Sequence, residues 1–276
     1  MWTEAHRARH EAGLKSIVTM LAVGQVAAWL EQADPPHSAR ALPTLAVVGA
    51  IAWHLRVGGP WRALPAGYPH WRTVYGWFRR WDEKGLFEAL MRHVARLRRR
   101  ARGRQHDPRL AVVDTQSVKA IPVRGPRGFD AAKRVVGRKR VALVDADGVW
   151  LALAVVPGST QDRDCLEALS AGKAAWPSLR VALLDGAFTA ERCRDWCHLH
   201  GMRHRVIERA PGQRGFVVVK KRWVVERTFG ALAHWGGLLR SRAGRLDVAA
   251  ARLACGVVLS GVEALANPKQ ILKTAA

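Results

Sequence analysis

The sequence predicts two parts: an all-α region over residues 1–105 and an α/β domain with a mixed sheet over residues 106–276. In the first hundred residues, apolar side chains recur at helical spacing. After the basic run that ends at Arg104, the pattern changes to short continuous apolar runs, which are typical of buried strands. The length of 276 residues suits two modest domains, and a hydrophobic content of 49% excludes a wholly disordered chain.

Two helices with a turn between them are predicted in the first part. Apolar residues at helical spacing predict a helix from Thr44 to Leu55, which Gly58-Gly59-Pro60 ends. A second helix follows a turn and begins near Trp71, with one apolar stripe and a separate face that carries Arg72, Tyr75 and Arg79. This order is typical of a helix-turn-helix that reads DNA, although an ordinary amphipathic helix with solvated arginines would show the same pattern.

The second part is predicted to alternate strands and helices. The Asp-Gly step in residues 145–148 indicates a hairpin, and the Gly- and Pro-rich residues 119–140 suggest a basic loop. Together these elements favour a mixed sheet flanked by helices. The predicted strands cover 110–114, 140–144, 149–156, 179–184, 203–208 and 216–219, and the predicted helices cover 161–175, 189–200 and a region starting near 221.

The formal net charge of +23 points to a polyanionic partner, and nucleic acid is the first candidate. Four cysteines are too few for a disulfide-stapled secreted domain, and no apolar stretch reaches the length of a membrane span, so we expect a cytoplasmic protein with no membrane role. Cys193, Cys197 and His198 could share a zinc ion, but buried cysteines beside surface histidines on a helix explain the pattern as well.

Two aspartates, Asp114 and Asp185, directly follow predicted buried strands. Parallel neighbouring strands would bring both carboxylates to the same end of the sheet, and oxygen ligands of this kind suit divalent cations. Glu226, on the last predicted helix region, is the candidate for a third carboxylate. The alternative is that both aspartates serve turns and that Glu226 pairs with neighbouring basic residues.

Five blocks in the second part of the chain carry a specific resemblance: Val113 to Lys119, Gly125 to Asp130, Gly137 to Arg140, Asp185 to Phe188 and Arg222 to Phe229. In this order they resemble the blocks of the bacterial insertion-sequence-five family of DDE transposases. The residues from Trp61 to Pro65 and from Trp71 to Trp81 resemble the family as well, and the resemblance covers roughly residues 45 to 265.

The resemblance implies a ribonuclease H-like catalytic domain in which Asp114, Asp185 and Glu226 hold two Mg²⁺ ions, for which Mn²⁺ can substitute. It implies that the protein binds the terminal inverted repeats of a mobile element, cleaves at the element ends and joins the 3′-hydroxyl to target DNA. It also implies a homodimer or higher oligomer in the synaptic complex and association with the nucleoid when the protein is bound to DNA. Candidate DNA contacts are Arg72, Thr73, Tyr75, Arg79, Arg80, Lys119, Arg138, Lys139, Lys220, Lys221, Arg222 and Arg227.

Two positions depart from the wider family signature. Val219 stands where a Tyr is typical, and Ala233 stands where a basic residue is typical. These departures motivate an alternative function, a transposase-derived DNA-binding protein whose catalysis is weakened or lost. A nuclease acting on RNA–DNA hybrids would share the metal site but would not explain the helix-turn-helix pattern.

Overall fold

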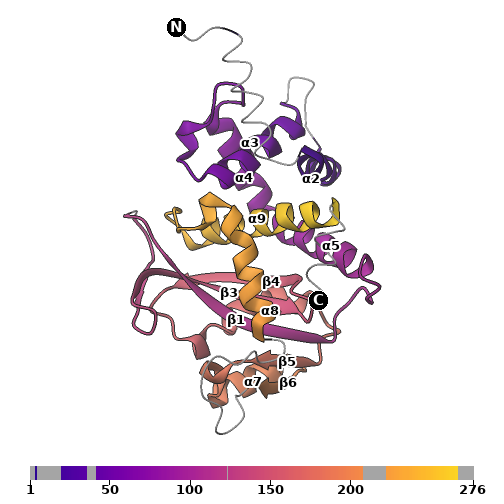
Figure 1. Ribbon diagram of the computed structural model, residues 1–276, viewed down its shortest axis with the longest axis vertical. Helices are drawn as coiled ribbons and strands as arrows, with labels where there is room; N and C mark the ends of the chain where they lie inside the picture. Colours follow the sequence, from indigo (N-terminus) through magenta and orange to yellow (C-terminus); the bar gives the residue numbers. More distant parts are fainter. Residues whose placement is uncertain (1–3, 5–19, 36–41, 123, 208–221, 267–276) are drawn as a thin grey trace.

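The computed structural model describes residues 4, 20–35, 42–122, 124–207 and 222–266. A layer of helices leads into a sheet, and the last helix returns to lie between them (Figure 1). The helices are α2 (Met20–Ala33), α3 (Thr44–Val57), α4 (Trp71–Glu83), α5 (Leu86–Arg100), α6 (Ser170–Ala174), α7 (Glu191–Leu199), α8 (Arg222–Gly230) and α9 (Leu246–Ala266). The strands are β1 (Leu110–Lys119), β2 (Gly128–Asp130), β3 (Val135–Asp145), β4 (Trp150–Pro157), β5 (Val181–Leu184) and β6 (Arg203–Val206).

The six strands form one mixed sheet. Its order is β2-β3-β1-β5-β6, and β4 also pairs with β3. The pairs that involve β3 are antiparallel, whereas β1 with β5 and β5 with β6 are parallel. A helical region followed by this mixed sheet confirms the predicted fold class.

Some predicted boundaries were wrong. The strand that was expected to end at Asp114 continues to Lys119, because β3 pairs with it over that whole length. Residues 119–140, expected to be a loop, include β2 and the first half of β3. In the second place, cross-strand hydrogen bonds outweigh the local Gly- and Pro-rich composition. The helix expected over 161–175 is two 3-10 turns followed by the short α6. The strand expected at 216–219 lies outside the described residues.

The connection between α3 and α4 is longer than a helix-turn-helix normally has. It runs from Gly58 to His70 and includes a 3-10 turn at Trp61–Ala63, whereas the motif typically uses three or four residues. Trp61 packs from this connection against Tyr75 and Phe78 of α4, with ring centroids 5.5 Å apart in each pair. The helices are present as predicted, but aromatic packing sets their arrangement.

The two faces of the sheet have separate cores. Val112, Ala142 and Leu183 belong to the core that includes the helical layer, α8 and α9. Val113, Leu143 and Leu184 belong to the other core, which includes residues of α7. We refer below to the first of these as the α8 face.

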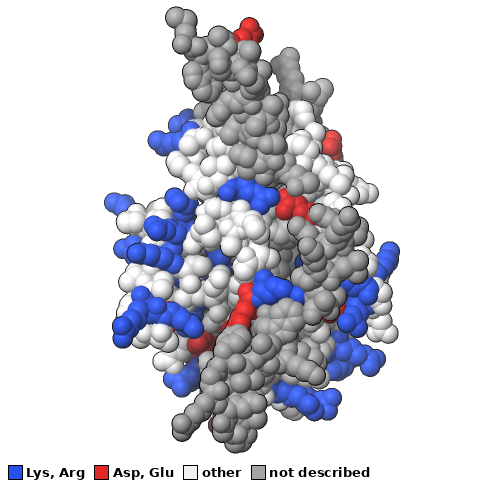
Figure 2. Space-filling model, in the orientation of Figure 1, with Lys and Arg blue, Asp and Glu red and all other residues white. Residues whose placement is uncertain are grey.

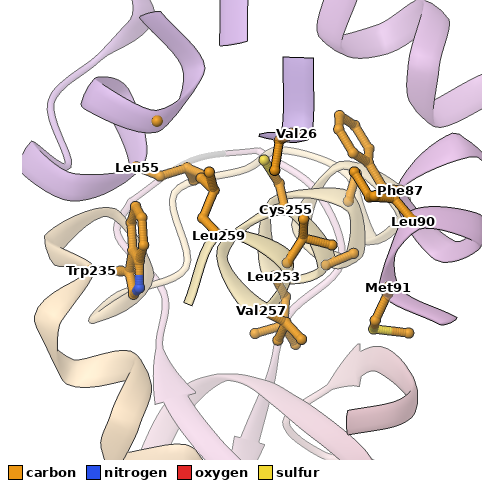
Figure 3. Close-up of a cluster of buried hydrophobic side chains, with 14 of the residues drawn as sticks. Val26, Leu55, Phe87, Leu90, Met91, Trp235, Leu253, Cys255, Val257 and Leu259 are labelled. Atoms are coloured by element: carbon orange, nitrogen blue, oxygen red, sulfur yellow. The ribbon is translucent and has the colours of Figure 1, made fainter. Parts of the chain in front are cut away.

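Helix α9 joins the predicted domains. Val26 of α2, Leu55 of α3 and Phe87 of α5 lie around it in a single cluster with Leu259, and Val257 continues the cluster toward the sheet (Figure 3). The helical layer and the sheet therefore share a core, and the division between residues 105 and 106 stays a prediction.

Among the described residues, α9 is the helix long and apolar enough to cross a membrane, but 72% of that stretch is buried inside the protein, as in a core helix.

Candidate active site

Asp114 and Asp185 lie at equivalent positions beside one another on neighbouring strands. In the parallel pairing of β1 with β5, Val112 is opposite Leu183. Each aspartate comes two residues later, so it lies on the same side of the sheet as the apolar residue before it. Val112 and Leu183 both face the α8 face. The pairing therefore places both carboxylates on that face, at the point where β5 ends and β1 continues.

Local hydrogen bonds orient both side chains. The backbone N–H of Thr115 donates to Oδ1 of Asp114 over 2.7 Å. The backbone N–H of Ala187 donates to Oδ1 of Asp185 over 3.0 Å, which caps the 3-10 turn at Gly186–Phe188. Both aspartates are only partly buried, so their carboxylates are accessible from the α8 face.

Glu226 comes from α8, which crosses β1 on this face (Figure 1). Two neighbours anchor its helix to the sheet. The ring of Phe229 packs edge-on against Trp150 at 5.5 Å. Oγ1 of Thr228 donates to the carbonyl of Val224 in its own helix over 2.7 Å and also lies 3.3 Å from the carbonyl of Gly148. Glu226 itself is exposed. Helix α8, which carries Glu226, thus lies on the face of the sheet toward which Val112 and Leu183 point.

The turn between β3 and β4 holds this helix in place. The predicted hairpin at residues 145–148 is confirmed, and Gly148 adopts a φ of +77°, in the left-handed region. A Cβ at this glycine would come within 2.5 Å of Oγ1 of Thr228. Arg227 adds a hydrogen bond of 3.3 Å to the carbonyl of Asp147. A glycine in the turn therefore permits the close approach of α8.

The chemistry of the three acids suits a divalent cation, but they do not form a closed cluster. Within residues 20–35, 42–122, 124–207 and 222–266, no three His, Cys, Asp or Glu side chains converge closely enough to hold a metal ion. Carboxylate oxygens remain the donors that Mg²⁺ prefers. The cysteines of the alternative zinc site, Cys193 and Cys197, are buried in α7 among apolar side chains.

Two other aspartates near the sheet, Asp145 and Asp162, have structural partners. Asp145 forms a buried ion pair with Arg99 and accepts from the backbone N–H groups of Asp147 and Val149, both over 2.9 Å. Asp162 accepts from Nζ of Lys139 over 2.9 Å. These contacts show that Asp145 serves the turn between β3 and β4, whereas Asp162 forms an ion pair with Lys139.

Two of the candidate DNA contacts are buried in the sheet, which contradicts the expectation that they touch DNA. The Arg138 side chain is 1% exposed and donates to the carbonyl of Pro126 over 2.8 Å and to Oγ of Ser241 over 2.9 Å. Lys139 is 6% exposed, with its ammonium between the carboxylates of Asp130 and Asp162. Both arginine and lysine lie on β3, where the sequence had suggested a loop.

Two arginines of α4 also have internal partners. The guanidinium of Arg79 lies 2.5 Å from Oδ2 of Asp82 and 3.3 Å from Oδ2 of Asp247. Arg80 makes two hydrogen bonds of 2.7 Å to the buried carboxylate of Asp34, and together with Lys84 it holds the pKa of that carboxyl well below its usual range. These ion pairs connect α4 to α2 and to the start of α9.

The remaining candidate contacts differ in exposure. Arg72 and Thr73 are exposed at the start of α4, Tyr75 is partly buried, and Lys119 is exposed at the end of β1. Lys220 and Lys221 lie outside the described residues, and so does the side chain of Arg222.

Lys and Arg side chains are spread over both flanks of the molecule, with a small acidic group between them near the middle of the view (Figure 2).

Sequence reasoning assigned no role to three arginines that the fold brings together, Arg240, Arg242 and Arg252. Their signal was the alternation of basic residues around Ser241, directly before the last helix. They line a pocket with Arg140 on the same face of the sheet as Asp114.

Two family models match this chain. The first, described as "Transposase DDE domain", covers residues 105–259, more than half of the chain, and contains Asp114, Asp185 and Glu226. The chain belongs to the DDE transposases. The second, described as "Putative transposase of IS4/5 family", covers residues 24–91, and together the two define an IS4/5-type transposase. A comparison with curated proteins found no match.

Proposed function

We propose that this transposase binds the terminal inverted repeats of an insertion sequence, cleaves at the element ends and joins the freed 3′-hydroxyl to target DNA. The observation that supports this proposal is the parallel register of β1 and β5 within the matched DDE domain: Val112 is opposite Leu183, and Asp114 and Asp185 each follow two residues later. Glu226 on α8 supplies the third carboxylate on the same face.

In this proposal the three carboxylates hold two Mg²⁺ ions, for which Mn²⁺ can substitute. Such a pair of ions activates the attacking oxygen and stabilises the leaving oxygen in phosphoryl transfer. Asp114 and Asp185 are preoriented by their backbone hydrogen bonds, whereas Glu226 depends on how α8 is anchored.

The test is cleavage of a duplex that carries the element end, in a buffer with Mg²⁺. The variants Asp114→Asn, Asp185→Asn and Glu226→Gln should each lose cleavage and keep measurable DNA binding. A matched control is Asp107→Asn, since Asp107 precedes β1 and pairs with Arg96 of α5. Cleavage by any of the three variants at the rate of the unmodified protein would remove that acid from the proposal.

A second candidate function is a DNA-binding protein without catalysis. Ala233, exposed in the 3-10 turn after α8, supports it, because a basic residue there would place positive charge beside the proposed DNA path. The two functions differ in the flanking DNA: intact inverted repeats around the coding sequence support mobility. Binding without cleavage of those repeats would favour this second function.

In the synaptic complex we further propose a homodimer or higher oligomer. Pairing two element ends requires two active sites, and each chain supplies one set of acids. Light scattering of the complex with end DNA tests this, and a 1:1 complex that still completes strand transfer would contradict it.

A further inference from the structure

Four arginines surround a small pocket on the α8 face. Arg140 comes from β3, Arg252 from α9, and Arg240 and Arg242 from the loop between α8 and α9. The pocket volume is about 20 Å³, which is room for one water-sized group. Its floor is highly basic, because Arg140 is 7% exposed and Arg252 is 5% exposed.

The two buried guanidiniums have neutral hydrogen-bond partners. Arg140 donates to Oε1 of Gln116 over 3.1 Å and to the carbonyl of Leu238. Arg252 donates to the carbonyl of Gly237 over 3.2 Å and to the ring of His54. Within the described residues no carboxylate pairs with either one, and burial lowers the pKa of each to about 10.

Other buried charges differ in their partners. Arg99 pairs with Asp145, whereas Arg138, like Arg140 and Arg252, donates to neutral groups. A buried cation is costly unless an anion is close, so an anion placed between Arg140 and Arg252 would be favoured. His54 cannot supply it: burial and the neighbouring Arg252 lower the pKa of His54 to about 2, so its ring is neutral and accepts a hydrogen bond.

The rim of the pocket is accessible from solvent. Arg240 and Arg242 are exposed, and within the part of the chain that the structure describes neither forms an ion pair or a side-chain hydrogen bond. Arg242 lies close enough to lower the pKa of Arg252 further. An anion at the mouth would therefore meet two exposed guanidiniums and lie above two buried ones.

The pocket adjoins the candidate active site. Gln116, which contacts Arg140, follows Asp114 by two residues on β1 and lies on the same face. Two residues of a strand span about 7 Å, about the rise of two nucleotides along one strand of a duplex. A DNA strand with its reacting phosphate at Asp114 would bring a nearby phosphate to the arginines.

We propose that these four arginines bind a phosphate of the DNA backbone about two nucleotides from the phosphate that is cleaved. One phosphate oxygen enters the pocket between Arg140 and Arg252, and Arg240 and Arg242 hold the remaining oxygens at the rim. Arginine forks match phosphate geometry and neutralise its charge. The proposal rests on the DNA-cleaving function above and names the part of the substrate that this pocket takes.

The test is a double variant, Arg240→Gln with Arg242→Gln, which leaves the buried arginines in place. With end DNA, the slope of log affinity against log salt should be shallower by about 1 to 2, because up to two phosphate contacts are lost. The matched control is Arg194→Gln with Arg203→Gln. Both are exposed and lie on α7 and β6, at the other end of the sheet order, and the control should keep the full slope.

A methylphosphonate scan of the DNA locates the phosphate. Removing the charge of a single phosphate near the cleavage site should weaken binding by the unmodified protein and have little further effect on the double variant. If every methylphosphonate weakens both proteins equally, no phosphate occupies the pocket and the proposal fails.

Thermal unfolding with inorganic pyrophosphate tests whether the pocket binds a free anion in place of a DNA phosphate. If pyrophosphate raises the Tm of the unmodified protein only, while the double variant keeps its full DNA affinity and salt slope, the pocket takes a free anion and the DNA assignment is wrong. If neither protein binds DNA, the proposed function fails instead, so the two failures are separable.

Discussion

Anchoring of α8 by Phe229 is a quantitative prediction of this structure. Phe229 is 6% exposed, and its ring meets Trp150, 4% exposed, at a centroid distance of 5.5 Å and an interplanar angle of 81°. Phe229→Ala removes the ring and leaves a cavity between α8 and β4. Losses of this kind cost about 3–5 kcal/mol of unfolding free energy.

Part of that cost comes from the edge-to-face geometry. Pairs of this kind contribute about 0.5–1.5 kcal/mol beyond the burial of area. A double-mutant cycle with Phe229→Leu and Trp150→Leu isolates this coupling, because leucine keeps much of the apolar volume at each site. The combined variant should therefore lose less stability than the two single variants added together.

The assay is urea unfolding followed by fluorescence and circular dichroism. Leu239→Ala is the control: Leu239 is 57% exposed, so its loss should change stability by no more than about 0.5 kcal/mol. A loss below about 1 kcal/mol for Phe229→Ala, or a coupling of zero in the cycle, would refute the packing that holds α8 and Glu226 against the sheet.

Three further predictions follow from single sites. Burial lowers the pKa of His54 in the folded protein to about 2, so below pH 6.5 the unfolded state binds one more proton than the folded state. The free energy of unfolding should therefore fall by up to about 1.4 kcal/mol per pH unit below pH 6.5. His54→Gln should reduce that slope in acid unfolding curves. Gly148→Ala should lower the Tm, because φ is +77° and the new Cβ would meet Thr228; an unchanged Tm would contradict this contact. Burial raises the pKa of the thiols of Cys197 and Cys255 to about 12, so iodoacetamide at pH 8 should label both only after unfolding, and rapid labelling of the folded protein would disprove their burial.

Local pattern was sufficient where a feature depends on neighbouring residues. The Asp-Gly turn, the apolar stripe of α4 and the strand before Asp185 all follow from spacing and turn chemistry, and the structure confirms them. The acids were found for the same reason: each follows a short apolar run or lies within a family block. Their position on one face follows from strand alternation together with the register of β1 and β5, and that register was not available from the sequence.

The candidate DNA contacts show where local sequence pattern fails to predict the role of a side chain. Arg79, Arg138 and Lys139 have the composition of a phosphate-binding surface, but a charged side chain is directed by partners that are distant in sequence. Ser241 accepts a hydrogen bond from Arg138 across 103 residues of sequence, and Asp162 accepts one from Lys139 across 23 residues. Charge alone cannot distinguish a structural ion pair from a free binding group.

By itself the sequence determined the class of fold and the strongly basic character of the chain, and it marked three acids as candidates, because periodicity, turn residues and composition are local properties. Only the tertiary structure decided which basic side chains are neutralised inside the protein, that α9 joins the helical layer to the sheet, and that Arg140, Arg240, Arg242 and Arg252 meet at one pocket. These are decided by long-range packing: burial and pairing depend on which distant segments the core brings together.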